Sequence, residues 1–236
     1  MTRAPDVRAC RRLFELLDWD ALGDVYCDSG GRAFWDAHRE PVLRCGAEWV
    51  GALLRRLDGR HGTSLYVGAG VAELPVMLAE SVVAGRKVVA VNRRGAECDL
   101  LEQGLRAAGI EPERLRIECG DAADHLDRGP FDHVSMVSVL SDPESWPVTS
   151  GVTYGTVPPV LLDVDAFVAE RRAITAFVAA VGDALAPRAL IATTVEEVAW
   201  FYAWRDAVGA EVDVDDEVFE TAVVGDPMGF LEVSKS

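Results

Sequence analysis

The feature that most limits the fold of this chain is a regular alternation of apolar and amphipathic stretches from Ser64 onward. Each apolar stretch is long enough for one strand, and each amphipathic stretch carries apolar residues at helical spacing. The predicted strands are SLYVGAG (64–70), KVVAVN (87–92), RLRIECGDA (114–122), PFDHVSMVSVLS (130–141) and RALIATTV (188–195), followed by a closing pair within FETAVVGDPMGFLEVSK (219–235). This order predicts an α/β fold with a doubly wound, mostly parallel, seven-stranded sheet and right-handed crossovers.

The first 62 residues lack this alternation and have a helical pattern. In RACRRLFELLDWDAL (8–22), Leu13, Leu16 and Leu17 fall on one face at helical spacing. A second helix is expected after Pro41, in PVLRCGAEWVGALLRRL (41–57). We therefore expect two units, an N-terminal helical cap at 1–62 and the α/β domain at 63–236.

One connection is too long for an ordinary loop. SDPESWPVTSGVTYGTVPPVLLD (141–163) is rich in Pro, Gly, Ser and Thr, and loops of this length are usually lids or disordered segments. It follows the carboxyl end of the fourth predicted strand, where ligands bind in open α/β sheets. We expect a lid or substrate insertion in which Trp146 and Tyr154 face the substrate; the alternative is that both rings only attach the loop to the body.

The net charge of −16 bears on the choice of partner. A polyanion is repelled by such a surface, so we expect no nucleic-acid partner. No apolar run reaches the roughly 18 residues of a membrane span, and the N-terminus lacks the apolar core of a secretory signal. We expect a cytoplasmic protein that does not bind membranes, and the sequence gives no oligomeric state.

The cysteines and histidines do not indicate a metal site. The five cysteines form no Cys-x-x-Cys pair, and the four histidines are scattered; they are Cys10, Cys27, Cys45, Cys98 and Cys119, with His38, His61, His125 and His133. We expect reduced thiols packed as small apolar groups.

A glycine turn follows the first predicted strand. SLYVGAGVAELP places Gly68 and Gly70 between that strand and the next helix. Glycines let the backbone turn tightly and let a ligand approach, and the free N–H groups of a helix start favour an anionic group. We expect a ligand at this turn, although a Gly-x-Gly pair by itself is weak support and a plain connection is the alternative.

The order of elements resembles the class I, Rossmann-like S-adenosylmethionine-dependent methyltransferases. The resemblance covers roughly Ser64 to the C-terminus and rests on LYVGAGVAELPVMLAE, KVVAVN, LRIECGDAADHL, FDHVSMVSVL, DALAPRALIATT and GFLEVSKS. It implies a methyltransferase-type sheet and S-adenosyl-L-methionine as cofactor. It also implies that the N-terminal helices cover the cofactor or shape the substrate site.

The resemblance also implies cofactor contacts at particular positions. Gly68, Ala69 and Gly70 would form the turn under the methionyl part, and Asn92 would hold the ribose hydroxyls. Asp121 with Ala122 would reach the adenine amino group, and Ser138 would line the pocket near the reacting methyl group. Arg93 follows Asn92 directly and is expected at the same site.

Two positions depart from the family pattern. The acid expected two residues before the first glycine is Tyr66, and the acid expected at the end of the second strand is Asn92. An amide cannot make the charge-assisted hydrogen bonds that a carboxylate makes. Glu73, at the start of the following helix, is a candidate replacement for the missing acid near the methionyl amine.

Arg93 and Arg94 support a rival interpretation. NADP-binding Rossmann proteins hold the 2′-phosphate with arginine at this strand end. Against it, the turn lacks the third small residue of dinucleotide folds, and Glu73 would repel a pyrophosphate. A solvent-exposed arginine pair is the third interpretation.

Methyl transfer requires an aligned nucleophile and sometimes a base. Asp142, just past the fourth strand, is the best-placed candidate base, although it could equally cap a turn. No Asn-Pro-Pro-Tyr or Pro-Cys motif follows that strand, so we expect a methyltransferase-like enzyme with a small-molecule acceptor. The alternatives are an inactive scaffold or binding protein that keeps the fold, an NADP-binding protein that uses Arg93 and Arg94, and aminobutyl transfer of the nicotianamine synthase type, suggested by the VGAG turn before Leu74-Pro75.

Overall fold

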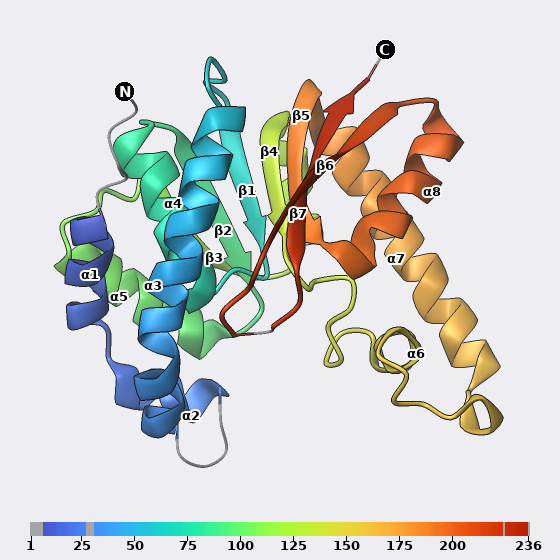
Figure 1. The fold of residues 1–236 in the computed structure, drawn as a ribbon, viewed down its shortest axis with the longest axis horizontal. Helices are drawn as coiled ribbons and strands as arrows, with labels where there is room; N and C mark the ends of the chain where they lie inside the picture. The colour runs from blue at the N-terminus through green and yellow to red at the C-terminus, as the bar shows by residue number, and fades with distance from the viewer. Residues whose placement is uncertain (1–6, 27–30, 224, 236) are drawn as a thin grey trace.

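The fold is built on one seven-stranded sheet, which confirms the predicted α/β class (Figure 1). The computed structural model describes residues 7–26, 31–223 and 225–235. The strand order is β3-β2-β1-β4-β5-β7-β6, and only β7 runs antiparallel to its neighbours β5 and β6. The strands are β1 (Thr63–Val67), β2 (Lys87–Asn92), β3 (Leu115–Cys119), β4 (Phe131–Met136), β5 (Leu185–Thr194), β6 (Glu211–Phe219) and β7 (Met228–Ser234).

Helices cover both faces of the sheet (Figure 1). The α-helices are α1 (Val7–Leu16), α2 (Trp19–Tyr26), α3 (Gly31–Arg56), α4 (Leu74–Leu78), α5 (Gly95–Ala107), α6 (Pro147–Thr153), α7 (Val164–Ala184) and α8 (Val198–Val208). Short 3-10 or π turns are η1 (Val71–Glu73), η2 (Ala79–Val83), η3 (Ala122–Arg128), η4 (Pro159–Leu161) and η5 (Val195–Glu197). None of the helices in the described ranges is both long and apolar enough to cross a membrane.

The core consists of two apolar layers, one on each face of the sheet. Side chains alternate between faces along a strand, so Tyr66 packs with α3 and α4 whereas Leu65 and Val67 pack with α7 and α8. Both faces of β1, β2 and β4 are buried. This explains the continuous apolar runs of these strands, because a parallel sheet is covered on both sides.

The N-terminal helices are part of the main core. Trp49, Val50 and Leu53 of α3 share one apolar cluster with Tyr66 of β1 and Phe230 of β7. These helices therefore pack along one face of the sheet, beside α4 and α5 (Figure 1). Their predicted role as a cap over a cofactor remains a prediction, and so does the 1–62/63–236 division, part of which lies outside the described residues.

Several predicted elements differ in extent; the helix expected after Pro41, for example, begins at Gly31 and contains Pro41. The closing pair of strands begins earlier, because β6 starts at Glu211 and forms an acidic, half-exposed outer strand. The fourth strand ends at Met136, since the chain turns through Ser138 with a φ of +56°. The segment 141–163 contains α6 and η4, so its predicted irregularity is only partly correct.

Candidate functional site

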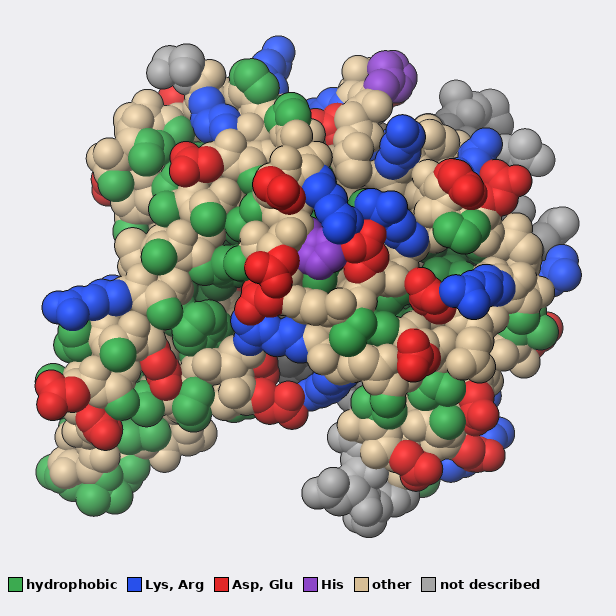
Figure 2. Space-filling model, turned by 180° about the vertical axis from the view of Figure 1, so that it is seen from behind, with side chains coloured by type: hydrophobic (Ala, Val, Ile, Leu, Met, Phe, Trp, Pro, Cys, Tyr) green, Lys and Arg blue, Asp and Glu red, His purple; other side chains and the backbone are tan. Residues whose placement is uncertain are grey.

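A cavity of about 550 Å³ opens at the carboxyl edge of the parallel strands. The turns that follow β1, β2, β3 and β4 line it, together with Trp35 of α3, Phe177 of α7, and Val223. Figure 2 shows the molecule hollowed between its two lower lobes. The volume lies within the ~300–1,000 Å³ typical of small-molecule sites, so this cavity is the candidate site.

Most of the predicted site residues meet in this cavity. Those that line it are Gly68, Gly70, Asn92, Arg93, Asp121, Ala122, Ser138, Asp142 and Trp146. Ala69 is buried at the turn, where its carbonyl accepts a hydrogen bond from Asn92 Nδ2 at 3.1 Å. Tyr154 does not line the cavity and is 42% exposed; its hydroxyl donates to Asp226 at 2.5 Å. The structure therefore gives no support for a substrate contact at Tyr154.

The glycine turn brings bare backbone to the cavity wall. Gly68 has a φ of +68°, which a residue with a Cβ adopts only with strain. Its N–H donates to the Val91 carbonyl at 2.8 Å, and a Cβ at this position would lie 3.2 Å from Val139 Cγ2. The conformation therefore strongly favours glycine here, and the space for a Cβ is tight.

Tyr66, which stands where the family has an acid, does not line the cavity. The side chain is 1% exposed, and its hydroxyl donates to the buried carboxylate of Glu80. Burial, together with the Glu80 charge, raises the pKa of Tyr66 well above its ordinary value. The tyrosine at this position therefore packs in the core on the α4 side of β1. It contributes no polar group to the cavity.

Glu73 supplies a carboxyl group at the cavity instead. It is 9% exposed, lines the cavity, and accepts a hydrogen bond from the Gly70 N–H at 2.8 Å. Burial raises the pKa of Glu73 to about 7, and the nearby charge of Glu97 acts in the same direction. A cation placed beside this group would favour its ionised form.

The raised pKa of Glu73 predicts a specific pH dependence of stability. Between about pH 4.5 and 7 the folded state keeps a proton on Glu73 that the unfolded chain has released. As the pH rises from about 4.5 to 7, the free energy of unfolding of the wild type, relative to that of Glu73→Gln, should therefore fall by at most about 3 kcal/mol. Above about pH 7 the difference should stay constant. Urea unfolding of both proteins from pH 5 to 8 measures this difference, and a pH-independent difference would contradict the assignment.

Asn92 is held by its neighbours at the end of β2. Its Nδ2 donates to Glu97 Oε2 at 2.9 Å as well as to Ala69, and its Oδ1 accepts from the Arg94 N–H at 2.9 Å. Glu97 lies in the first turn of α5, is fully buried and lines the cavity. A carboxylate therefore stands beside the amide at the site where the expected strand-end acid is missing.

Glu97 could not be recognised as a site residue from the sequence. The signal was an acid five residues past the end of β2, in the first turn of a helix, where an acid is common for its favourable interaction with the helix dipole. Only the packing of α5 against β2 shows that this side chain turns inward.

The arginine pair is neutralised by carboxylates at the cavity rim. Arg93 pairs with Asp121 at 2.5 Å, and Arg94 pairs with Glu144 at 2.7 Å. A 2′-phosphate would have to compete with both carboxylates for the arginines. This arrangement disfavours the NADP alternative.

Asp142 lines the cavity but is also a capping residue. Its Oδ2 accepts hydrogen bonds from the Ser145 N–H at 3.1 Å and the Ser145 hydroxyl at 2.6 Å, and its Oδ1 accepts from the Glu144 N–H at 3.2 Å. Trp146 donates through its indole N–H to the Val139 carbonyl at 3.0 Å. The turn after β4 is thereby fixed, and Ser138 and Trp146 are held at the cavity wall.

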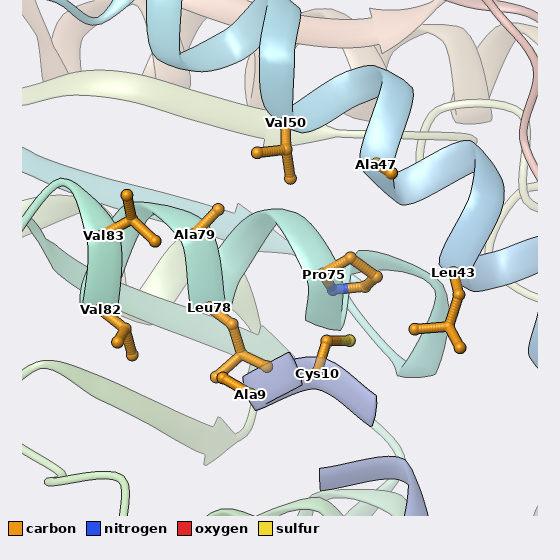
Figure 3. Close-up of a pocket in the computed structure, with 10 residues that line it drawn as sticks. All are labelled: Ala9, Cys10, Leu43, Ala47, Val50, Pro75, Leu78, Ala79, Val82 and Val83. Carbon is orange, nitrogen blue, oxygen red and sulfur yellow. The ribbon is translucent and has the colours of Figure 1, made fainter. Parts of the chain in front are cut away.

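A second hollow lies between α1, α3 and α4 (Figure 3). It measures about 30 Å³ and is lined by apolar residues of α1, α3, α4 and η2, among them Leu43, Pro75 and Val82. Cys10 faces it, and burial raises the pKa of its thiol to about 12, so this thiol is unreactive. Such a volume holds little more than one water molecule, so this hollow is not the candidate site.

The described residues include no cluster of three or more histidine, cysteine or acidic side chains that could hold a metal ion. Four cysteines are free thiols: Cys10, Cys45, Cys98 and Cys119. Cys27, the fifth, lies outside the described residues. His133 is fully buried and contacts Glu80 at 2.8 Å.

Known structures with the same fold include two methyltransferases that match the whole chain. A putative O-methyltransferase from Klebsiella pneumoniae is 12% identical, with 100% of this chain and 93% of that one covered at a TM-score of 0.53. Magnesium protoporphyrin IX methyltransferase (ChlM) from Synechocystis PCC 6803, solved with bound SAM, is 15% identical, with both chains fully covered at a TM-score of 0.51. Against family models and curated proteins, the sequence has no match.

A third structure, TrmN from Thermus thermophilus, is 19% identical and matches 78% of this chain at a TM-score of 0.47. The matched part spans 47% of the TrmN chain, and a likeness this weak supports no argument. The two full-length matches establish that the chain has the fold of the class I, Rossmann-like methyltransferases. The resemblance predicted from the sequence is therefore confirmed for the fold.

Proposed function

We propose that this chain binds S-adenosyl-L-methionine in the cavity and transfers its methyl group to a small-molecule acceptor. The observation that carries the proposal is the pair of buried carboxyl groups, Glu73 and Glu97, beside the Gly68–Gly70 turn. The cofactor carries an ammonium and a sulfonium group, so it requires acids and bare backbone at this position. The bound ligands of the fold relatives, such as SAM in ChlM, are consistent with this assignment.

The proposed contacts follow the order of the strands. The turn at Gly68, Ala69 and Gly70 lies under the methionyl part, and Glu73 pairs with its ammonium group. Asn92 and Glu97 together hold the ribose hydroxyls in place of the single missing acid.

The remaining contacts lie further along the sheet edge. Asp121 and Ala122 lie at the adenine end, where Asp121 is already paired with Arg93. Ser138 lines the wall nearest the methyl group, and its hydroxyl donates to Asp226 at 3.3 Å.

The bound cofactor supplies an electrophilic methyl group on a positively charged sulfur. The protein must exclude water, align the acceptor with that methyl group and, for a hydroxyl or amine acceptor, receive a proton. Asp142 is the proposed proton acceptor, since its carboxylate lies at the cavity and is oriented by a hydrogen bond from the Ser145 hydroxyl. Trp146 and Phe177 provide apolar wall for the acceptor.

The charge of the cavity indicates the acceptor class. Its walls carry five acids and two arginines, so acidic side chains outnumber basic ones at this site. Such a site favours a neutral or cationic acceptor over an anionic one. We therefore propose a small neutral or cationic molecule and disfavour nucleic acid.

The role of Glu73 is tested with two ligands that differ in the amino-acid part. Glu73→Gln should weaken the binding of S-adenosylmethionine by roughly 10- to 100-fold, because a hydrogen bond to a charged group contributes about 1.5–3 kcal/mol. Binding of 5′-methylthioadenosine, which lacks the ammonium and carboxylate groups, should be unchanged. Calorimetry of both proteins with both ligands measures this.

The control for this test is Glu102→Gln, which removes an acid from the outer face of the same region, where Glu102 pairs with Arg106 at 2.6 Å. This variant should bind both ligands like the wild type. If Glu73→Gln weakened the binding of both ligands equally, Glu73 would not contact the methionyl group. That result would refute the role proposed for Glu73.

A further inference from the structure

An arm of the molecule projects beyond the sheet and ends in exposed apolar side chains. It consists of α6, η4 and the first half of α7, and Figure 1 shows it extending away from the strands. Leu161 is 73% exposed, Val164 is 61% exposed and Val168 is 39% exposed. Figure 2 shows hydrophobic side chains gathered at the tip of one lower lobe, which is unusual for a surface in contact only with water.

The exposed valines near the start of α7 lie on a face of the helix directed away from the body. Val164, Val168 and Arg172 follow at intervals of four and therefore share a side. Glu170 points to the other side, where its carboxylate accepts from the N–H groups of Val148 and Thr149 in α6 at 3.2 and 2.7 Å. No described element covers the Val164–Val168 face.

The charges at the two ends of this face are opposite. Asp165 lies at its start and Arg172 at its end, and neither has an ion-pair partner among the described residues. A helix face with an acid at one end and a base at the other is complementary to itself in antiparallel orientation. Two copies related by a two-fold axis at Val168 bring Asp165 of each opposite Arg172 of the other, with Val164 and Val168 between them.

We infer that this arm is a self-association surface, and that two copies pair through antiparallel α7 helices centred on Val168. The arm extends beyond the strands of the sheet, so its outer face is open to a second copy (Figure 1). The charge of −16 disfavours an anionic membrane as the occupant. One helix pair buries less than the ~1,600 Å² of a standard interface, so the dimer should dissociate at micromolar concentration.

The test is sedimentation velocity of the full chain over a concentration series up to roughly 100 µM. The wild type should shift from monomer to dimer. Val168→Asp should remain a monomer, whereas Val208→Asp, at a 54% exposed valine of α8, should dimerise like the wild type. Circular dichroism confirms that each variant is folded.

Charge reversal tests the antiparallel register. Asp165→Arg and Arg172→Glu should each raise the dimer dissociation constant about tenfold, because each places like charges opposite one another, and the double variant should restore it. A wild type that stays monomeric, or single and double variants that weaken the dimer additively, would overturn the inference.

Discussion

Replacement of Arg86 by methionine is expected to lower the free energy of unfolding by about 3–5 kcal/mol. The guanidinium is 2% exposed and pairs with Glu80 Oε2 at 2.9 Å and with Asp132, and it donates to Ser64 Oγ at 2.9 Å. Methionine preserves much of the volume but removes the charge. Glu80 is fully buried, so its carboxylate would lose one of its charged hydrogen-bond partners.

The electrostatics of Glu80 explain why this cost is large. Burial by itself would raise its pKa, but His133 and the hydroxyls of Ser64 and Tyr66 bring the pKa down to about 2. The group is therefore ionised in the core at neutral pH and depends on its partners. The stability it contributes is present above its unfolded pKa of about 4.5 and is lost as the pH falls toward 2.

The matched control is Arg106→Met, in which an exposed arginine loses its i,i+4 partner Glu102. Exposed pairs of this kind contribute about 0.3–0.5 kcal/mol. Urea unfolding of the two variants at pH 7 gives the comparison. A loss below about 1 kcal/mol for Arg86→Met would mean that the buried network contributes little to stability.

Gly68→Val is expected to reduce binding of S-adenosylhomocysteine at least a hundredfold. The φ of +68° is costly for a β-branched residue, and its Cβ would lie 3.2 Å from Val139 at the cavity wall. The bare backbone that a ligand would approach is therefore replaced by methyl groups. Calorimetric titration of the folded variant measures the loss.

Gly109→Val separates backbone strain from the loss of the binding surface. Gly109 has a φ of +77°, and a Cβ there has no neighbour within 4 Å. This variant carries the same strain after α5, away from the cavity, and should bind like the wild type. Equal binding by both variants would show that the ligand does not approach the Gly68 turn.

The part of the site that could be predicted from the sequence is the part made by strand ends. Gly68, Asn92, Asp121 and Ser138 each follow a strand, and parallel strands bring their carboxyl ends to one edge. Their meeting in one cavity therefore follows from the strand order alone. The sheet was predictable for the same reason, since buried parallel strands are continuous apolar runs.

Features that depend on side-chain direction could not be predicted. Tyr66 and Glu73 are close in sequence, but only the fold shows that the tyrosine turns to Glu80 and the glutamate to the cavity. Glu97 likewise points into the cavity, and only the packing of α5 against β2 shows it. The strand β6 was misplaced because its residues alternate acid and valine, which protects an exposed edge but has little apolar signal.

Calorimetry of the purified chain against S-adenosylmethionine, S-adenosylhomocysteine and NADPH distinguishes the proposed cofactor from its rival. We expect binding of both sulfur ligands at one site per chain and no heat with NADPH, because Glu73 and Glu97 favour a cationic ligand and Arg93 and Arg94 are already paired. The absence of a binding heat with both sulfur ligands would contradict the proposed cofactor site. A binding heat with NADPH alone would then indicate that Arg93 and Arg94 bind its 2′-phosphate.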